Sequence, residues 1–518
     1  MQVFEIVIAL LLGGAALAAI ARRISTPYPA LVAVAGAGLA LVPRVPTVML
    51  DPELALALFV APVLLDAAFD ASPRDLRANW RPVTSLALGA VALTIAVVAL
   101  VARALVPDMP WAAAIALGAI VAPPDAAAAT TVLKQLRPPH RLLVILEGES
   151  LFNDASALLV YRVAVGAAVT GFVSGWRVVP LVLFVTIGSV ILGLVLARVM
   201  MASTAHINDV ATAVIVQFCG TFAVWMLAER LHLSGILTMV VFAMAVSRRA
   251  AEVIPARMRL PSYAVWEVAV FVLNVLAFIL VGLQLRQIVT RLERAARIEY
   301  AWVAAAVCAA AILARLAWVM IAATKGAGLS ARAAMLVGWC GMRGTVTLAA
   351  ALALPVRFPH RDLILVTAFG VVLGTLVLQG MTLRPLLNLL RLEDDGEVER
   401  EVRLARVETL RAALEAIEEC PGAETADLVR RRYEVLLRRA DAELADDPAS
   451  AESAEATGLS RALESDAEVV RTATAAERQR LNAMRADGTI GDAAFQKIEQ
   501  ELDWAELDLS VVLRAEVR

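Results

Sequence analysis

Residues 111–136 have the sequence "WAAAIALGAIVAPPDAAAATTVLKQL", which is long enough to span a membrane but is interrupted at its centre by Pro123, Pro124 and Asp125. The two prolines remove two backbone donors and obstruct a regular helix. Broken backbone at membrane depth persists only where protein or a water-filled cavity satisfies the freed polar groups. The stretch therefore predicts an interrupted helix with a carboxylate at its break.

The rest of the chain favours a polytopic membrane protein. Its 518 residues are 60% hydrophobic, with a mean hydropathy of +0.74, whereas soluble domains are about 45–50% apolar. Apolar runs near the roughly 20 residues that a spanning helix needs follow one another to about residue 392. We predict an all-α fold of about 13 transmembrane helices.

The loops between these runs set the expected orientation. Basic residues fall in alternate loops, which the positive-inside rule assigns to the cytoplasm. This places the N-terminus outside and the C-terminal tail in the cytoplasm. One arginine-rich loop, 286–297, falls on the opposite side and disagrees.

Charge divides the chain near residue 392. Residues 1–392 carry 30 Lys and Arg against 18 Asp and Glu, whereas residues 393–518 carry 17 against 31. The acidic part has no spanning run, and its apolar residues recur at helical spacing. One such face contains Leu404, Val407, Leu410, Leu414 and Ile417. We expect 1–392 to form a transmembrane domain and 393–518 a soluble helical tail, either regulatory or simply solvated.

A second interrupted helix is expected in "ARAAMLVGWCGMRGTVTLAAALALP", residues 331–355, where three glycines surround Arg343. Two interrupted helices seven spans apart are typical of transporters built from inverted repeats around a midplane site. Spans 1–6 and 8–13 would form two inverted six-helix repeats, in which the broken helices cross.

Polar residues also interrupt the apolar stretch "LEGESLFNDASALLVYRVAV", residues 146–165. Helix rise places Asp154, Asp125 and Arg343 roughly 16–21 Å along their spans, near the middle of a core about 30 Å thick. A lone charge there costs from about 2.5 to beyond 10 kcal/mol. A carboxylate avoids this cost by holding a proton or a metal cation, so we expect Na⁺ and H⁺ to compete for Asp154. Glu149 is then free to pair with Arg343.

Three motifs, "GESLFNDA", "PPDA" and "GMRGTVTLAAALALP", resemble the monovalent cation/proton antiporter-1 family, in its NhaP-type branch related to the eukaryotic sodium/proton exchangers. The resemblance covers all the predicted spans. It implies a homodimer in the plasma (inner) membrane and electroneutral exchange by an elevator-like movement. It implies no cofactor and no nucleic acid partner; the partners are monovalent cations, protons and the lipid bilayer.

The resemblance also assigns roles to seven side chains. They are the ion- and proton-binding Asp154, its partner Asp125, the hydroxyl ligand Ser150, the orienting amide Asn153, the structural ion pair Glu149–Arg343, and the cavity residue Asp66 on the third span. Na⁺ or another monovalent cation would bind to Asp154, Asp125 and Ser150.

The sequence departs from the family pattern at two places. The usual Thr-Asp-Pro is Pro124-Asp125-Ala126 here, so no threonine hydroxyl is present, although the carbonyl of Pro124 can still coordinate an ion. The family usually has the longer Glu at the position of Asp66. A role at the cavity entrance and a solvated position near the loop are therefore equally open for Asp66.

Several alternatives remain from the sequence alone. Asp154 could form a buried salt bridge, Asp125 could cap a helix, and Ser150 could bond to the i−4 carbonyl. Arg162 and Arg315, also in apolar runs, would snorkel or form structural pairs. The main functional prediction is exchange of Na⁺, or of Li⁺ or K⁺, for H⁺. The alternatives are a K⁺-selective antiporter regulated by its tail, a cation channel or leak on the same fold, and a membrane sensor.

Overall fold

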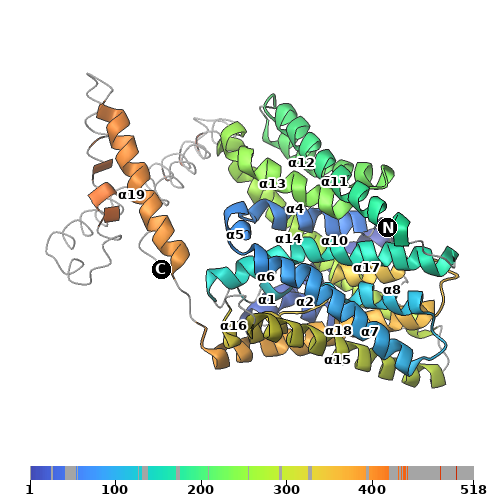
Figure 1. Cartoon of the computed structure of the whole chain (residues 1–518). Coiled ribbons are helices and arrows are strands. Elements are labelled where there is room, and N and C mark those ends of the chain that lie inside the picture. The colour runs from blue at the N-terminus through green and yellow to red at the C-terminus, as the bar shows by residue number, and fades with distance from the viewer. Residues whose placement is uncertain are drawn as a thin grey trace. The chain divides into compact units, whose positions relative to one another are not determined.

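The computed structural model describes most of the transmembrane region and part of the tail. The described ranges are 2–24, 27–40, 56–125, 128–130, 138–170, 175–207, 209–254, 256–290, 294–324, 329–392 and 396–418, with a few separate residues at 42, 54, 133, 430, 433–434, 436–438, 440–441, 479, 483 and 498. Every regular element in these ranges is a helix, and none is a strand (Figure 1). The all-α prediction is confirmed.

The chain divides into two compact units, residues 1–395 and 396–518. The sequence predicted a boundary at residue 392. The first half of unit 1 contains α1 (Gln2–Ile24), α2 (Tyr28–Ala40), η1 (Leu56–Val60), α4 (Ala61–Asp70), α5 (Pro73–Ala78), α6 (Trp80–Thr84), η2 (Ser85–Ala90), α7 (Val91–Leu105) and α8 (Trp111–Val121). Helices α6, η2 and α7 follow one another without a break.

The longer helices follow. They are α10 (His140–Thr170), α11 (Gly175–Thr204), α12 (Val210–Arg230), α13 (Gly235–Val253), α14 (Ala256–Thr290), α15 (Arg294–Thr324), α16 (Ala331–Trp339), α17 (Thr345–Leu352) and α18 (Arg361–Leu390). Pro123 and Pro124 lie just beyond the end of α8, as expected for a helix that cannot continue through two prolines.

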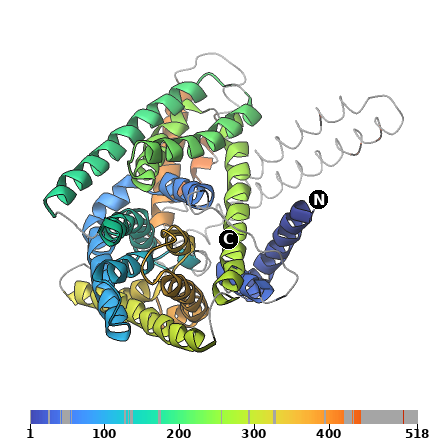
Figure 2. The same cartoon turned by 90° about the vertical axis from the view of Figure 1, so that its right-hand side faces the viewer.

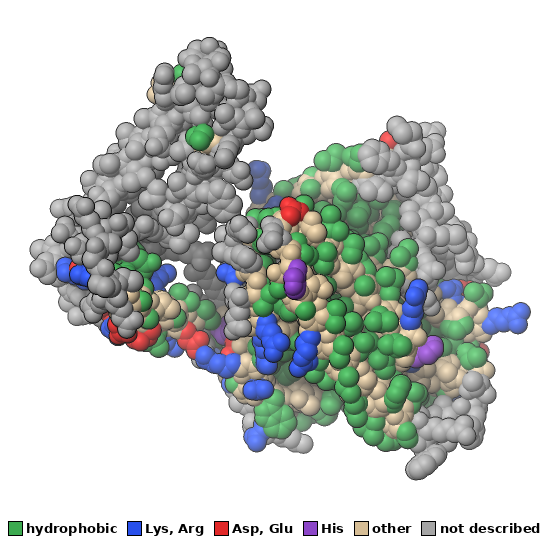
Figure 3. Space-filling model, turned by 90° about the horizontal axis from the view of Figure 1, so that it is seen from above, with side chains coloured by type: hydrophobic (Ala, Val, Ile, Leu, Met, Phe, Trp, Pro, Cys, Tyr) green, Lys and Arg blue, Asp and Glu red, His purple; other side chains and the backbone are tan. Residues whose placement is uncertain are grey.

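Within the described ranges, six helical segments are long and apolar enough to cross a membrane: 80–105, 179–204, 210–230, 261–280, 298–324 and 361–390. Two shorter apolar helices, α2 and α8, accompany them. The surface is correspondingly apolar: Figure 3 shows hydrophobic side chains over much of the visible face, and Phe184, Ile187 and Ile191 of α11 are exposed. The unit is a polytopic helical membrane protein, while the count of thirteen spans stays a prediction.

Buried side chains form two main packed groups within unit 1. The larger group joins α2, α7, α8, α10 and α14–α18. The smaller joins η1 and α4 with α11–α13. In Figures 1 and 2, α11 and α12 lie on one side of the unit and α7, α15 and α18 on the other, with α10 between them. Helix α10 therefore borders both groups.

Helices α2 and α14 pack backbone to backbone through two glycines. A β-carbon on Gly36 would lie 2.6 Å from the carbonyl oxygen of Ile279, and one on Gly282 would lie 2.5 Å from the backbone nitrogen of Ala37. Small residues allow such close approach, which is a main source of helix association in membranes.

Gly36→Ala should therefore separate α2 from α14 and lower the melting temperature of the purified protein. Gly38→Ala is the matched control on the same helix, because a β-carbon there meets no atom within 4 Å. The control should be neutral or slightly stabilising, since alanine is favoured over glycine in a helix by about 0.5–1 kcal/mol. Equal melting temperatures for the two variants would contradict this packing.

The described part of the tail begins with α19 (Glu397–Glu418). Val407 is buried and Leu410, Leu414 and Ile417 are half-buried, whereas Leu404 is 52% exposed. Arg411 of α19 bonds to Asp441 at 2.9 Å. The predicted apolar face is therefore present but narrower than expected, since Leu404 lies outside it.

Candidate functional site

The broken fifth helix carries the first half of the site. Residues 122–125 leave the helical conformation after α8 ends at Val121, and residues 126–127 lie outside the described part. The interruption predicted from Pro123 and Pro124 is confirmed. Pro124 is buried, and Asp125 is half-buried.

The second break lies between α16 and α17, where residues 340–344 are not helical. The two breaks are joined by a backbone bond, because Asp125 N–H donates to the carbonyl of Met342 at 2.7 Å. The fully buried Arg343 donates from Nε to the carbonyl of Val121 at 2.6 Å and from Nη1 to the carbonyl of Gly341. Its guanidinium therefore satisfies carbonyls that the broken helices leave open.

Gly344 brings the two breaks into close contact. A β-carbon at this position would lie 1.7 Å from Oδ2 of Asp125, so no other residue leaves room for that carboxylate. Gly344 is also the residue that precedes α17, a helix of 8 residues. The Asp125 carboxylate thus lies at a helix N-terminus, whose dipole favours negative charge.

Helix α10 brings the second carboxylate to the same place. Asn153 and Asp154 are both buried, at 0% and 6% exposure. Asn153 Nδ2 donates to the carbonyl of Pro124 at 3.0 Å, which fastens α10 to the first break. Asp154 lies close enough to Asp125 for their charges to interact. The two predicted carboxylates are therefore near one another, with Asp154 buried and Asp125 half-buried.

Two other predicted residues lie on α10 and on its neighbour α4. Ser150 lies one turn before Asp154 on α10, and Asp66 lies on α4, which packs against α10. Both are half-buried, and both already interact with other groups. Asn153 Oδ1, in contrast, is a buried oxygen that accepts no hydrogen bond from any described residue.

Tyr28 and Asn274 are additional residues near the site that the sequence did not single out. Tyr28, at the start of α2, shares a side-chain hydrogen bond with Asn274 of α14 and lies within range of the Asp125 charge. An asparagine in the middle of the apolar stretch 261–280 was the available signal.

The predicted ion pair between Glu149 and Arg343 is wrong. Glu149 forms a bidentate pair with Arg315 of α15, through Nη1 to Oε1 and through Nη2 to Oε2, the latter at 2.8 Å. Arg315 also donates to the carbonyl of Val337 at 3.1 Å. Arg343 has no carboxylate partner among the described residues because its guanidinium bonds to the carbonyls at the breaks instead. Arg315 therefore forms a structural ion pair, which is one of the two roles, beside snorkelling, that the sequence left open for it.

Helices broken at membrane depth beside paired carboxylates are features of secondary transporters. The transmembrane sodium/hydrogen exchanger family matches residues 6–389 of this chain. An uncharacterized Na(+)/H(+) exchanger of Mycobacterium tuberculosis is 30% identical over 507 residues, covering 93% of this chain and 91% of the relative. The chain belongs to the sodium/hydrogen exchanger family, whose members are secondary transporters rather than enzymes.

Two further comparisons agree with this assignment. The sodium, potassium, lithium and rubidium/H(+) antiporter of Bacillus pumilus is 30% identical, covering 72% of this chain and 59% of that protein. The structure of the sodium proton antiporter MjNhaP1 from Methanocaldococcus jannaschii at pH 8 matches with a TM-score of 0.60 at 17% identity, over 75% of this chain and 99% of the other. The structural match shows the same fold, and the predicted family resemblance is confirmed.

Glu149→Gln should destabilise the protein strongly, because it leaves the Arg315 guanidinium buried without its counter-charge, at a cost of about 3–5 kcal/mol. Arg315→Met should act similarly through Glu149, and the double variant should recover much of the loss. Arg162→Gln on the same helix is the control, since its pair with Glu229 is 47% and 40% exposed and is worth at most about 1 kcal/mol. Thermal unfolding of the four variants tests the pairing, and additive single effects would contradict it.

Gly344→Ala should displace the Asp125 carboxylate. If this carboxylate binds the cation, the rise in melting temperature on adding Na⁺ should shrink or vanish, because a ligand stabilises only the state that binds it. Gly166→Ala on α10 is the control, since a β-carbon there meets nothing within 4 Å. Melting temperatures without Na⁺ separate this effect from general destabilisation, and full Na⁺ stabilisation in Gly344→Ala would exclude Asp125 as a ligand.

Proposed function

We propose that this protein exchanges Na⁺ for H⁺ across the plasma membrane, with both ions competing for Asp154 and Asp125. The observation that carries the proposal is the meeting of these two carboxylates, from α10 and from the broken helix after α8. Membership of the sodium/hydrogen exchanger family supports the same chemistry.

The competition follows from charge. Two carboxylates close together in a buried site repel one another, and the repulsion is relieved when one takes a proton or when a cation binds between them. A bound proton removes the negative charge that attracts the cation, and a bound cation disfavours the proton. One site therefore accepts the two ions in alternation.

The ligands proposed for the cation are oxygens, which suit a hard alkali cation. They are the carboxylates of Asp154 and Asp125, the hydroxyl of Ser150 and the carbonyl of Pro124. Asn153 orients that carbonyl through its amide nitrogen, and its Oδ1 faces no hydrogen-bond donor within the described ranges. Asp66 is proposed as a residue of the cavity entrance.

Alternating access would come from movement between the two packed groups. The site belongs to the group that includes α8, α10 and α16–α18, whereas α11–α13 pack with α4 separately. An elevator-like displacement of the first group in a homodimer fits this division. In this proposal the N-terminus faces outward, and the acidic tail is cytoplasmic and regulates exchange.

One-for-one exchange is favoured by the residue before Asp154. Asn153 is neutral, so the pair Asn153-Asp154 brings one carboxylate rather than two to the site. A single proton or a single monovalent cation is then enough to neutralise the extra charge. We therefore propose that transport is electroneutral.

The choice of cation has a second candidate. The name of the Bacillus pumilus relative includes potassium, lithium and rubidium beside sodium, which supports exchange of K⁺ or Li⁺ as the alternative. A channel or leak on the same fold ranks lower, because the broken helices are held tightly together by Asp125, Met342 and Arg343.

Asp154→Asn should abolish cation-driven proton flux in proteoliposomes while leaving the protein folded, because an amide cannot alternate between proton and cation. Flux measured with Na⁺, Li⁺ and K⁺ over a range of pH identifies the substrate. Since the ligands must be deprotonated to bind metal, the apparent cation affinity should fall as the pH is lowered. Asp66→Asn is the comparison variant, which should retain measurable exchange.

Three outcomes would count against the proposal. Full activity in Asp154→Asn would show that Asp154 is not the residue for which the cation and the proton compete. Flux that does not saturate with cation and ignores the proton gradient would indicate a channel. Flux that changes when the membrane potential is clamped at zero would contradict electroneutral exchange.

A further inference from the structure

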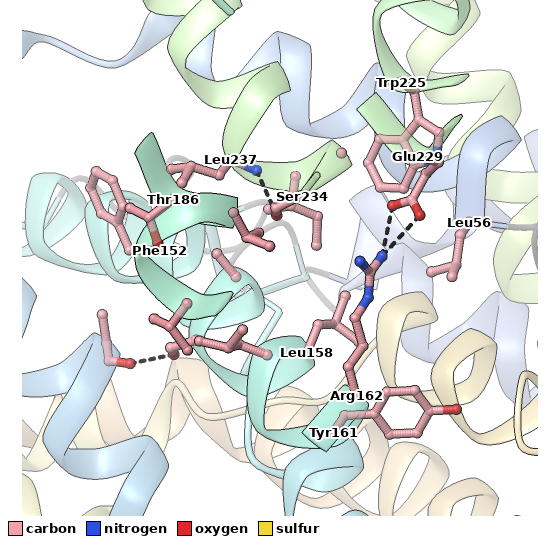
Figure 4. Close-up of a pocket in the computed structure, with 18 of the residues that line it drawn as sticks. Leu56, Phe152, Leu158, Tyr161, Arg162, Thr186, Trp225, Glu229, Ser234 and Leu237 are labelled. Carbon is pink, nitrogen blue, oxygen red and sulfur yellow. Dashed lines mark hydrogen bonds and ion pairs between the residues drawn. The ribbon is translucent and has the colours of Figure 1, made fainter. Parts of the chain in front are cut away.

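A long groove in unit 1 is lined by residues of α10 and of α11–α13, beside the contact of Leu151 of α10 with Val240 and Ala243 of α13. Its volume is about 1790 Å³, larger than the roughly 300–1,000 Å³ of a usual small-molecule site. Figure 4 draws part of this lining, including Phe152 and Leu158 of α10, Thr186 of α11 and Leu237 of α13. The groove can therefore hold a molecule larger than a usual small-molecule ligand.

The walls of the groove are mainly apolar. Leu88, Leu181 and Met226 line it and are each more than half exposed, at 55%, 54% and 51%. Along α10 the lining runs from Phe152 to Gly166, which corresponds to about 21 Å of helix. Because the hydrocarbon core of a bilayer is about 30 Å thick, this wall lies at the depth of lipid acyl chains.

The charged residues of the lining are mostly positive. They are Arg77, Arg162, Arg230 and Arg248, with Glu229 as the single carboxylate in this lining, every residue of which the structure describes. Arg162 Nη2 bonds to both oxygens of Glu229 at 2.9 Å (Figure 4). Since Glu229 is already neutralised, the groove favours an anionic occupant.

Two of the arginines lie at the same end of the groove. Ser247 of α13 donates to the carbonyl of Phe69 at 2.6 Å, so the end of α13 meets the end of α4, from which α5 follows. Arg248 is next to Ser247, and Arg77 lies on α5; both are exposed. Basic pockets between transmembrane helices bind anionic lipid headgroups on the cytoplasmic side, the side where the sequence places both arginines.

We propose that this groove is a binding site for an anionic phospholipid, with its headgroup at Arg77 and Arg248 and its acyl chains along α10. The apolar walls fit the chains, and the two arginines fit the phosphate. Phe152 and Ala155 of the lining flank Asn153 and Asp154 in sequence. The lipid thus contacts the helix that carries the candidate ion site.

Binding of phosphatidylglycerol and of phosphatidylcholine with identical acyl chains to the delipidated full-length protein, measured by native mass spectrometry, tests the proposal. Phosphatidylglycerol should bind more tightly. Arg77→Gln/Arg248→Gln should weaken phosphatidylglycerol binding about 30-fold, since each arginine near a headgroup is worth about 1 kcal/mol, and should leave phosphatidylcholine binding unchanged.

The control is Arg74→Gln/Arg249→Gln, which removes two charges from the same two helices outside the lining and should leave the lipid preference intact. Ala155→Leu, which adds a larger side chain to the lining, should weaken binding of both lipids, with melting temperature confirming that it folds. Equal binding of the two lipids by the wild type, or an equal loss in the control, would overturn the proposal. A change of oligomeric state in Ala155→Leu without loss of lipid would show that a second copy of the chain covers the groove instead.

Discussion

The crossing of two broken helices is the constraint on which the rest of this structure depends. Backbone groups at membrane depth must find partners inside the protein, and each break here supplies what the other lacks. The second break provides the Met342 carbonyl for Asp125 N–H and the Arg343 guanidinium for the Val121 carbonyl. Gly344 provides the space in which the Asp125 carboxylate lies. If the two segments separated, several buried polar groups would lose their partners together. Each break is therefore stable only in contact with the other.

Helix α10 is tied to this crossing at two levels. Asn153 bonds to the carbonyl of Pro124, and Glu149, one turn earlier, pairs with Arg315 of α15. Asp154 is consequently held by a helix that cannot rotate or slide without breaking buried polar bonds. The site is therefore part of one packed group, while the groove lined by apolar residues runs between α10 and part of α11–α13. This combination fits the movement proposed above for alternating access.

The sequence predicted the features that local chemistry dictates. Adjacent prolines and clustered glycines indicated both breaks, and the high cost of a charge in hydrocarbon identified Asp125 and Asp154 as partners. It failed at Glu149, because Arg315 and Arg343 both lie deep in apolar runs, and spacing along the chain does not tell which guanidinium faces which helix. The open carbonyls of the broken helices need hydrogen-bond donors, and Arg343 supplies them. Arg315 is then the guanidinium that pairs with the Glu149 carboxylate. The contacts of Gly344 with Asp125 and of Tyr28 with Asn274 were likewise fixed only by the packing of distant segments.

The pairing of Glu149 with Arg315 instead of Arg343 has a consequence for ion leakage across the membrane. Glu149 and Arg315 cancel one another, so Arg343, Asp125 and Asp154 leave the crossing with a formal charge of −1 when the site is empty. One proton or one monovalent cation brings it to zero. We therefore expect both loaded forms to traverse the low-dielectric interior with equal ease and without sensing voltage, whereas the unloaded form is held back by its uncompensated charge. Tight coupling would then arise from electrostatics alone, without a separate gate to prevent an empty return.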